Sequence, residues 1–159
     1  MTIDQTSRTP VVFNGLEALE AAVGTHLGRS DWREVTQDHV NTFADLTLDH
    51  QWIHVDVERA AHSPFGGTVA HGFLSLGMVP TLAEEVYRYE GFAMSLNYGA
   101  SKLRFPAPLP AGSRVRGSFE LAAVSQISAG YLVQVDATVE VEGGTKPACF
   151  IEWLVVLVP

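Results

Sequence analysis

Residues 49–76 read DHQWIHVDVERAAHSPFGGTVAHGFLSL, and we expect the rest of the chain to be arranged around them. The stretch begins with an irregular segment that carries Asp49 and His54, continues through a Gly-rich loop and ends at a helix start. An acid–base pair can move the protons of a water molecule, and glycines let a substrate approach the backbone. Unpaired N–H groups at a helix start stabilise developing negative charge. The stretch therefore predicts an enzyme that acts on a carbonyl compound.

The length and charge of the chain narrow the class of protein. At 159 residues it is expected to form one domain, residues 1–159, which would bury roughly 70% of its unfolded surface. The formal net charge of −8 argues against a nucleic-acid partner, because phosphate binding needs a dense basic face. Met1–Pro10 lacks an apolar signal segment, and the longest apolar runs fall far short of the ~20 residues that cross a bilayer. We expect a soluble, cytoplasmic protein with no membrane partner.

The first third of the chain predicts a tail and two helices. Residues 1–13 form the tail, whose end packs on the domain. A helix follows Asn14, its expected N-cap, and ends within residues 24–28. Residues 30–35 form a connector or short strand, and Thr36 caps the second helix. The apolar residues expected to face inward are Leu16, Leu19, Val23 and Leu27 on the first helix, and Val40, Phe43 and Ala44 on the second.

The longest predicted helix runs from Val69 or Ala70 to about Tyr89, bends at Pro80 and ends at Gly91. Its apolar side chains are distributed nearly all round it. They are Phe73, Leu74, Leu76, Met78, Val79, Leu82, Ala83 and Val86. A helix that is apolar on every side is expected in the interior, so a sheet should wrap around it.

The chain after Gly91 alternates apolar and polar residues, as strands do. The alternation slips at Gly99–Ala100, which predicts a β-bulge, and residues 106–112 form a loop rich in proline. Turns are predicted at Ala129–Gly130 and Gly143–Gly144. The fold expected is α+β, an antiparallel meander of about four strands curled around the central helix. Its open edges and exposed outer face favour a homodimer.

Two segments resemble the hydratase motif of the MaoC-like dehydratases, a hot-dog-fold family that includes (R)-specific enoyl-CoA hydratases and nodulation-protein-N-like hydratases. The motif Gly-Asp-x-Asn-Pro-hydrophobic-His-x-Asp appears here as residues 48–56, LDHQWIHVD. Its second half, Phe-Gly-Gly-x-hydrophobic-Ala-His-Gly, appears as residues 65–72, FGGTVAHG. Residues 102–108, KLRFPAP, resemble the family's strand running into a Pro-rich turn. The resemblance therefore covers about residues 36–158.

Two positions depart from the motif. Leu48 stands where the family has glycine, and Gln51–Trp52 replaces Asn-Pro. Trp52, anchored in the core, is expected to fix the loop in place of the rigid proline turn. The catalytic Asp and His of the motif are retained as Asp49 and His54.

The resemblance implies reversible hydration of trans-2-enoyl-CoA to (R)-3-hydroxyacyl-CoA in fatty acid metabolism, with no added cofactor. Asp49 and His54 would hold one water molecule between them. We expect Asp49 to take a proton from the water and His54 to help deliver one to the α-carbon. The backbone N–H of Gly72 would donate to the thioester oxygen. The other oxyanion or substrate-binding candidates are Ser63, Gly67 and His71.

The substrate carrier, CoA or acyl carrier protein, would bring negative phosphate to an acidic protein. Basic side chains are therefore expected near the mouth of the site, although charges on a strand usually serve only to solvate it. Four of the ten basic residues fall in one span, and these candidates are Lys102, Arg104, Arg114 and Arg116.

Other chemistries have less support in the sequence. His26, His39, His50 and His62 are scattered without ligand spacing, so no metal is predicted. Cys149 lies in an apolar run and is expected to pack in the core. Ser63 lacks the elbow signature of a serine nucleophile, and His71 is expected to hold the loop by hydrogen bonds. Two rivals remain, a hot-dog acyl-CoA thioesterase and a non-catalytic acyl-thioester-binding subunit.

Overall fold

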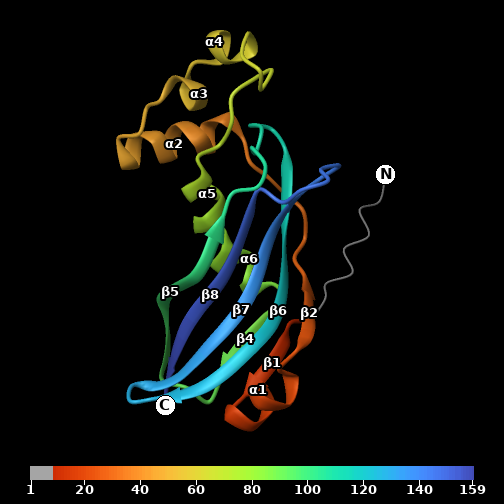
Figure 1. Cartoon of the computed structure of the whole chain (residues 1–159), viewed down its shortest axis with the longest axis vertical. Helices are drawn as coiled ribbons and strands as arrows, with labels where there is room; N and C mark the ends of the chain where they lie inside the picture. The colour runs from red at the N-terminus through yellow and green to blue at the C-terminus, as the bar shows by residue number, and fades with distance from the viewer. Residues whose placement is uncertain (1–8) are drawn as a thin grey trace.

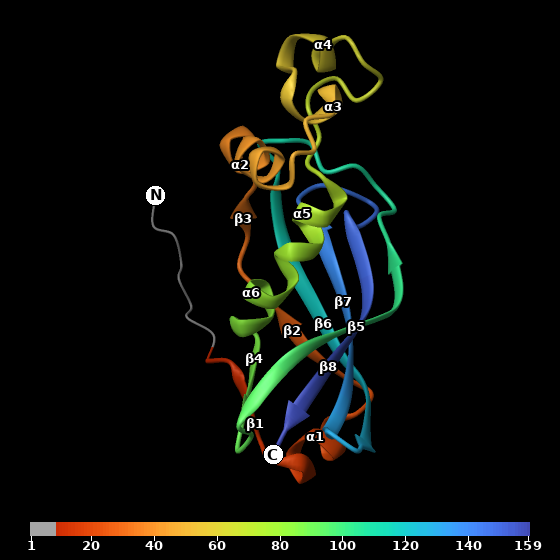
Figure 2. The same ribbon diagram turned by 90° about the vertical axis from the view of Figure 1, so that its left-hand side faces the viewer.

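A computed structural model describes residues 9–159 and shows a curved sheet with a helical layer on one face (Figures 1 and 2). The elements in chain order are β1 (Val11–Asn14), α1 (Leu16–Ala22), β2 (Thr25–Arg29), β3 (Arg33–Glu34), α2 (Gln37–Thr47), α3 (Trp52–Val55), α4 (Val57–Ala61), α5 (Gly72–Gly77), α6 (Val79–Glu84), β4 (Tyr87–Glu90), β5 (Met94–Arg104), β6 (Arg114–Ile127), β7 (Gly130–Val141) and β8 (Cys149–Val158). The large sheet has the order β2-β6-β7-β8-β5, with β3 also paired to β6. The architecture is α+β, as the sequence predicts.

The alternation of β6 and β7 builds the core. One face of each strand is buried, and these residues are Val115, Gly117, Phe119 and Leu121 on β6 and Val133, Val135, Ala137 and Val139 on β7. Each CH₂ group removed from water there contributes about 0.8 kcal/mol. Cys149, at the start of β8, is also buried, and burial raises the pKa of its thiol to about 11. The prediction that it packs in the core is confirmed.

The prediction of a simple meander is wrong in one respect. β6, β7 and β8 do follow one another as antiparallel neighbours, but β5 lies on the far side of β8 and forms an edge of the sheet. The chain therefore crosses over β7 and β8 between β5 and β6. The predicted bulge is confirmed, because the β5–β8 register shifts between Asn97 and Gly99 and again between Ala100 and Lys102.

The central helix is shorter than predicted and is divided in two. α5 ends at Gly77 and α6 begins at Val79, with Pro80 in its first turn, where a missing N–H costs least. The bend expected at the proline is thus a break just before it. α6 ends at Glu84, so neither Tyr89 nor Gly91 terminates a helix.

The residues after α6 form β4, which pairs in parallel with β1. Phe13 of β1 is buried, with its ring centroid 6.2 Å from that of Tyr87 and 6.4 Å from that of Tyr89. The predicted packing of the tail's end is confirmed for Phe13, whereas Val11 and Val12 are exposed, and residues 1–8 lie outside the described part. Burial of three aromatic rings between two distant segments outweighs the helical periodicity of residues 85–89.

The first helix also differs from the prediction at both ends. Asn14 belongs to β1, and the N-cap is Gly15, which has no side chain that could cap the helix. The helix stops at Ala22, and the residues after it form β2 against β6. Pairing with the edge of β6 offers these residues backbone partners that a further helical turn would forgo.

The second helix agrees with the prediction. The Thr36 hydroxyl accepts from the backbone N–H of His39, and the His39 ring accepts from the backbone N–H of Thr36. Val40 and Ala44 are buried. Within residues 9–159, no helix has the length and apolar character needed to span a bilayer.

Candidate active site

The segment of residues 49–72 stands at one end of the sheet, where α3 and α4 project beyond the strands (Figures 1 and 2). It starts directly after Leu48, the C-cap of α2, whose backbone φ of 61° is left-handed. A residue with a Cβ pays about 1–2 kcal/mol for this conformation. This cost explains why glycine suits this position of the motif, and Leu48 adopts the left-handed conformation despite it.

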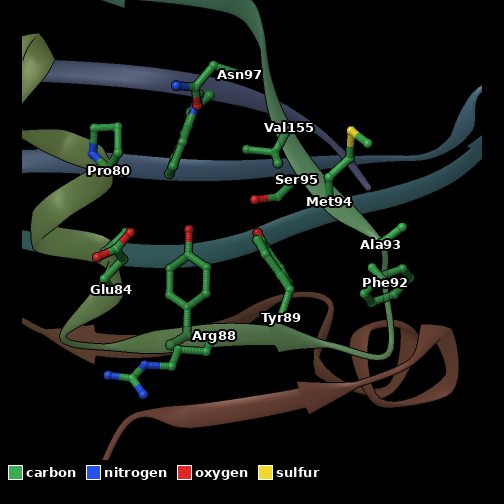
Figure 3. A pocket seen from close by; sticks show the side chains of 13 residues that line it. Pro80, Glu84, Arg88, Tyr89, Phe92, Ala93, Met94, Ser95, Asn97 and Val155 are labelled. Carbon is green, nitrogen blue, oxygen red and sulfur yellow. The ribbon is translucent and has the colours of Figure 1, made fainter. Parts of the chain in front are cut away.

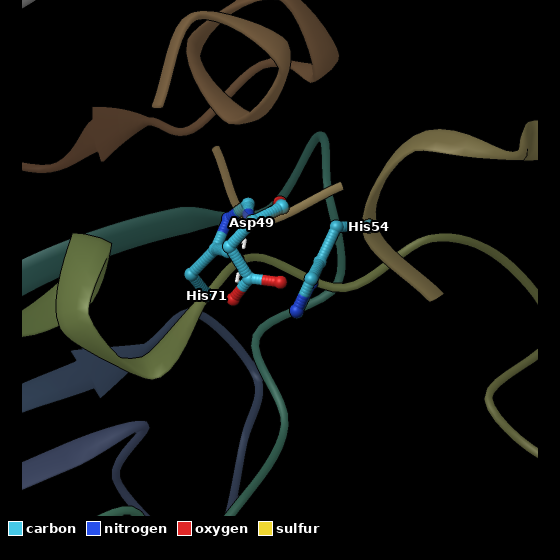
Figure 4. A group of neighbouring side chains, drawn as sticks. All are labelled: Asp49, His54 and His71. Carbon is cyan, nitrogen blue, oxygen red and sulfur yellow. Dashed lines mark hydrogen bonds and ion pairs between the residues drawn. The ribbon is translucent and has the colours of Figure 1, made fainter. Parts of the chain in front are cut away.

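Three side chains of the segment meet in space. Asp49, His54 and His71 offer polar atoms that all lie within 4.8 Å of one another. The Asp49 side chain is 55% exposed, whereas both histidines are buried. Figure 4 shows the Asp49 carboxylate and a ring nitrogen of His54 directed toward the same space. The predicted acid–base pair is therefore assembled, with the histidine fixed and the carboxylate open to solvent.

The ring of His54 is held by the backbone of the Gly-rich loop. Its Nδ1 lies 2.6 Å from the carbonyl oxygen of Val69. A carbonyl only accepts, so Nδ1 carries the hydrogen in this bond. In the neutral ring, Nε2 then presents a lone pair. The backbone N–H of Val69 donates in turn to the carbonyl of Ile53, at 3.0 Å, so the two chain segments brace each other.

His71 lies behind the pair. Its Nε2 donates to the backbone carbonyl of Asp49 at 2.9 Å and lies 4.0 Å from that residue's carboxylate. Its ring stacks on His54 with centroids 3.7 Å apart, and Phe43 of α2 packs against it at 4.9 Å. His71 thus ties the start of the segment to its end.

Gly72 is the first residue of α5, and two aromatic side chains lie beside it. A Cβ at this position would come within 3.0 Å of the Phe105 ring, so glycine lets this ring pack closely against the backbone. Phe105 also meets Phe73 edge-on, with centroids 5.8 Å apart. Phe105 belongs to residues 102–108, which the sequence already singles out, but no spacing rule predicts its contact with Gly72.

The remaining loop candidates differ in what they offer. The Ser63 hydroxyl donates to the carbonyl of Ala60 at 2.6 Å and accepts from the N–H of Phe65, so its hydrogen is used inside the loop. Gly67 is half-buried with open space around its Cα. The positive φ of 69° that the loop needs belongs to Gly66 instead.

The four basic candidates do not gather at one place. Lys102 and Arg104 lie on β5 and Arg114 and Arg116 on β6, and two strands separate β5 from β6. Arg114 pairs with Glu142 at 3.0 Å, and Arg116 with Glu140 at 2.7 Å.

Glu140 is held between two arginines. Burial acts to raise the pKa of Glu140, but hydrogen bonds from Arg116 and Arg29 outweigh it and leave that pKa below its ordinary value. Arg116 is therefore committed to a neighbour on its own sheet. On β5, the Lys102 ammonium lies 5.6 Å from the centre of the Phe150 ring, and the phosphate contacts stay a prediction.

Asp49, His54 and His71 are also residue types that bind metal ions. His54 Nδ1 is bonded to a carbonyl, and so is His71 Nε2. The remaining nitrogen of His71, Nδ1, is buried without a partner. The groups directed at open space are then the Asp49 carboxylate and His54 Nε2, which is fewer than the three protein ligands of a typical catalytic zinc site. The donor set fits acid–base chemistry better than metal binding.

Two cavities lie along the helical layer. One, of about 360 Å³, is lined by apolar residues of α2, α5 and α6, including Phe43, which contacts His71. The other, of about 630 Å³, lies between α6, β4, β5 and β8, as Figure 3 shows, with Tyr89 directed across it. Burial raises the pKa of Tyr89 to about 12. Neither cavity is lined by Asp49, His54 or His71, and the first is connected to the cluster through Phe43, which contacts His71.

Fold and site together define an α+β protein in which Asp49, His54 and His71 cluster near the start of the central helix. The family model described as "MaoC like domain" matches residues 18–143, and the chain belongs to this family of dehydratases with the hot-dog fold. Dehydratases are hydro-lyases by definition.

Named relatives cover most of the chain. The 3-hydroxyacyl-thioester dehydratase Z of Mycobacterium tuberculosis (strain ATCC 25618 / H37Rv) is 51% identical over 144 residues, which are 90% of this chain and 95% of the relative. Nodulation protein N of Rhizobium leguminosarum bv. viciae is 41% identical over 145 residues, 89% of this chain and 90% of the relative. Among solved structures, the (R)-hydratase of A. caviae involved in PHA biosynthesis superposes with a TM-score of 0.69 at 22% identity, covering 86% and 98% of the two chains. That structural likeness bears on the fold.

Proposed function

We propose that this chain is a 3-hydroxyacyl-thioester dehydratase that works reversibly as an (R)-specific enoyl-CoA hydratase in fatty acid metabolism. The observation that carries the proposal is the meeting of Asp49 and His54 beside the start of α5. The 51% identity to a 3-hydroxyacyl-thioester dehydratase over nearly the whole chain supports the reaction class. The choice of CoA, the (R) configuration and the pathway come from the resemblance of the motif.

The geometry suits the binding of one water molecule. The Asp49 carboxylate and the His54 Nε2 lone pair both accept hydrogen bonds, so a water between them donates both of its hydrogens. Its own lone pairs then face away from the two residues. A trans-2-enoyl thioester placed there would meet an oriented nucleophile, and such acid–base positioning contributes roughly a hundred- to ten-thousand-fold in rate.

Hydration then balances without an oxidant or reductant. The water oxygen bonds to the β-carbon as one of its O–H bonds breaks, and the electrons of the double bond move onto the thioester oxygen. The proton released by the water then passes through the pair to the α-carbon, for which His54 Nε2 must first accept it, and the carbonyl re-forms. Our prediction remains that Asp49 takes the water proton and His54 helps to deliver one to the α-carbon. Dehydration follows the same steps in reverse.

The thioester oxygen needs a donor while it carries negative charge. The N–H groups in the first turn of a helix have no partner within the helix, and Gly72 is the first residue of α5. One such donor contributes about a hundred- to a thousand-fold in rate. The Phe105 ring against Gly72 would exclude water from this oxygen and strengthen the bond. We propose that the acyl chain enters the apolar cavity lined by Phe43.

The assembly proposed is a homodimer. β5 is an edge strand that pairs with β8 on one side, and its side chains are mostly exposed. Met94, Leu96 and Tyr98 add exposed apolar surface there. A second copy paired along β5 would satisfy the edge and cover that surface. Light scattering of the purified chain should give twice the monomer mass, and a monomeric mass would contradict this.

One-domain organisation and a cytoplasmic location remain predictions.

Hydration of crotonyl-CoA and of a longer trans-2-enoyl-CoA tests the proposed reaction. Loss of the conjugated-enone absorbance measures the rate, and chiral analysis of the product gives its configuration. We expect (R)-3-hydroxyacyl-CoA from the wild type, and a rate about a hundred- to ten-thousand-fold lower from Asp49→Asn. Asp45→Asn is the matched control, because Asp45 is an exposed carboxylate that contacts His50 at 2.8 Å outside the cluster. Release of free thiol would instead support the thioesterase, and tight acyl-CoA binding without turnover would support the binding subunit.

A further inference from the structure

One side chain outside the motif connects the two halves of the site. Gln37 is the first residue of α2, and its amide lies between the backbone of His54 and the side chain of Thr68. Its Nε2 donates to the His54 carbonyl at 2.8 Å and to the Asn41 side-chain oxygen at 2.9 Å. Its Oε1 accepts from the buried Thr68 hydroxyl. Both amide hydrogens and the amide oxygen are thus used.

The direction of each bond fixes the orientation of the amide. The His54 carbonyl and the Asn41 side-chain oxygen only accept, so the NH₂ group of Gln37 must face them. The oxygen of the amide must then face the hydroxyl of Thr68. A carboxylate at position 37 would keep the bond from Thr68 but turn an oxygen toward two other oxygens. Gln37 cannot therefore be exchanged for Glu without breaking the half of the network that holds His54.

The network acts on the reacting nitrogen through the backbone. Thr68 directly precedes Val69, whose carbonyl accepts from His54 Nδ1. Gln37 thus donates to the backbone carbonyl of His54. Through Thr68 it also positions the Val69 carbonyl, which accepts from the His54 ring. When both are fixed, the hydrogen stays on Nδ1, and Nε2 keeps its lone pair directed at the water. Resting on the proposed function, we infer that Gln37 is a positioning residue that sets the ring orientation and tautomer of His54.

The variant that tests this is Gln37→Glu, compared with Thr68→Val and Asn41→Ala. A Glu in the first turn of α2 is favourable to the helix, so the variant is expected to fold. We expect kcat for crotonyl-CoA to fall about a hundred-fold, the effect of moving a reacting group by about 1 Å, while KM stays within about two-fold. Thr68→Val should lower kcat less, because the donors of Gln37 remain. Asn41→Ala should have little effect, because Asn41 is exposed.

The matched control is Gln126→Glu, the same chemical change at an exposed position of β6. The second readout is the ¹⁵N chemical shifts of the His54 ring, which distinguish a hydrogen on Nδ1 from one on Nε2. The wild type should show it on Nδ1, and Gln37→Glu should show a mixture. An unchanged kcat in Gln37→Glu, or a ring signal identical to that of the wild type, would overturn the inference. If the wild type hydrates no enoyl-CoA, the proposed function fails, and the ring signal alone still decides the role of Gln37.

Discussion

The 49–72 segment and the β6–β7–β8 core are built on opposite principles. The core is held by apolar side chains from alternating positions, of which Phe119 is the largest fully buried one. The segment is only about half exposed and is held by directed hydrogen bonds, such as those of His54 with Val69 and of His71 with Asp49. Burial of apolar surface stabilises a fold without fixing the orientation of side chains. Hydrogen bonds fix that orientation, but each adds little net stability. Substitutions in the segment should therefore change mainly the reaction rate, whereas substitutions in the core should change mainly the free energy of unfolding.

The largest effect is expected for His54→Gln. Loss of the ring removes one acid–base group, so kcat/KM should fall about a hundred- to ten-thousand-fold, while the melting temperature changes little. His62→Gln is the matched control, because His62 also bonds a backbone carbonyl through Nδ1, that of Glu58 at 2.8 Å, but lies outside the cluster. Steady-state kinetics and thermal melts of both variants check this. A melting temperature as low as that of a core variant would show that His54 also stabilises the fold.

Phe119→Ala tests the other side of the comparison. Phe119 is 1% exposed and meets Tyr87 edge-on at 5.8 Å. Removing the ring should lower the free energy of unfolding by about 3–5 kcal/mol, measured by urea denaturation. The molecules that stay folded should keep near-normal kcat, because Phe119 contacts none of the clustered side chains. Phe150→Ala, at a half-buried position of β8, should cost much less. Equal losses in the two variants would contradict the proposed difference in burial.

Leu48→Asn acts where the two regions join. Leu48 is 81% exposed and has left-handed φ, so its side chain gains little from packing while its backbone is strained. Asparagine tolerates this conformation better, and we expect the free energy of unfolding to rise by about 0.5–1 kcal/mol with kcat unchanged. Leu46→Asn is the control, because Leu46 is equally exposed but helical, and there asparagine should be neutral or slightly destabilising. A loss of stability in Leu48→Asn would show that the leucine side chain contributes to the turn.

The smallest effect concerns the outer face of the sheet. Glu140 has a pKa below its ordinary value in the folded chain, so its pairs with Arg116 and Arg29 stabilise the fold above the unfolded-state pKa. This contribution is lost as the pH falls through the folded-state pKa. Urea denaturation from neutral to acidic pH should show a shallower decline in Glu140→Gln than in the wild type. Identical pH profiles would mean that solvent screens the pairs fully.

The sequence was sufficient where the physical cause is local. The Thr36 cap, the alternation of β6 and β7, and the bulge beside Gly99 each depend on residues within a few positions of one another. The acid–base pair was found through the motif, and the structure brings it together. The roles of individual site residues stay predictions.

The sequence failed where a distant partner decides the outcome. Residues 85–89 look helical, but pairing of β4 with β1 and the packing of Phe13 draw them into a strand. Gln37 and Phe105 approach the site across 17 and 33 positions, from His54 and Gly72 respectively, and no spacing rule connects such pairs. Their contacts follow from the tertiary arrangement of α2 and β5.

β1 pairs with β4 and β2 pairs with β6, so both strands depend on residues that are synthesised later. β1 needs residue 87 and β2 needs residue 118 before either has a partner. Contacts that close such long loops form late, whereas the turns joining β6, β7 and β8 are short and local. During synthesis, the first strand and helix therefore leave the ribosome well before anything that they pair with. A nascent chain stopped before residue 87 would carry both strands unpaired. One stopped before residue 118 would still carry β2 unpaired and exposed to chaperones or to other chains.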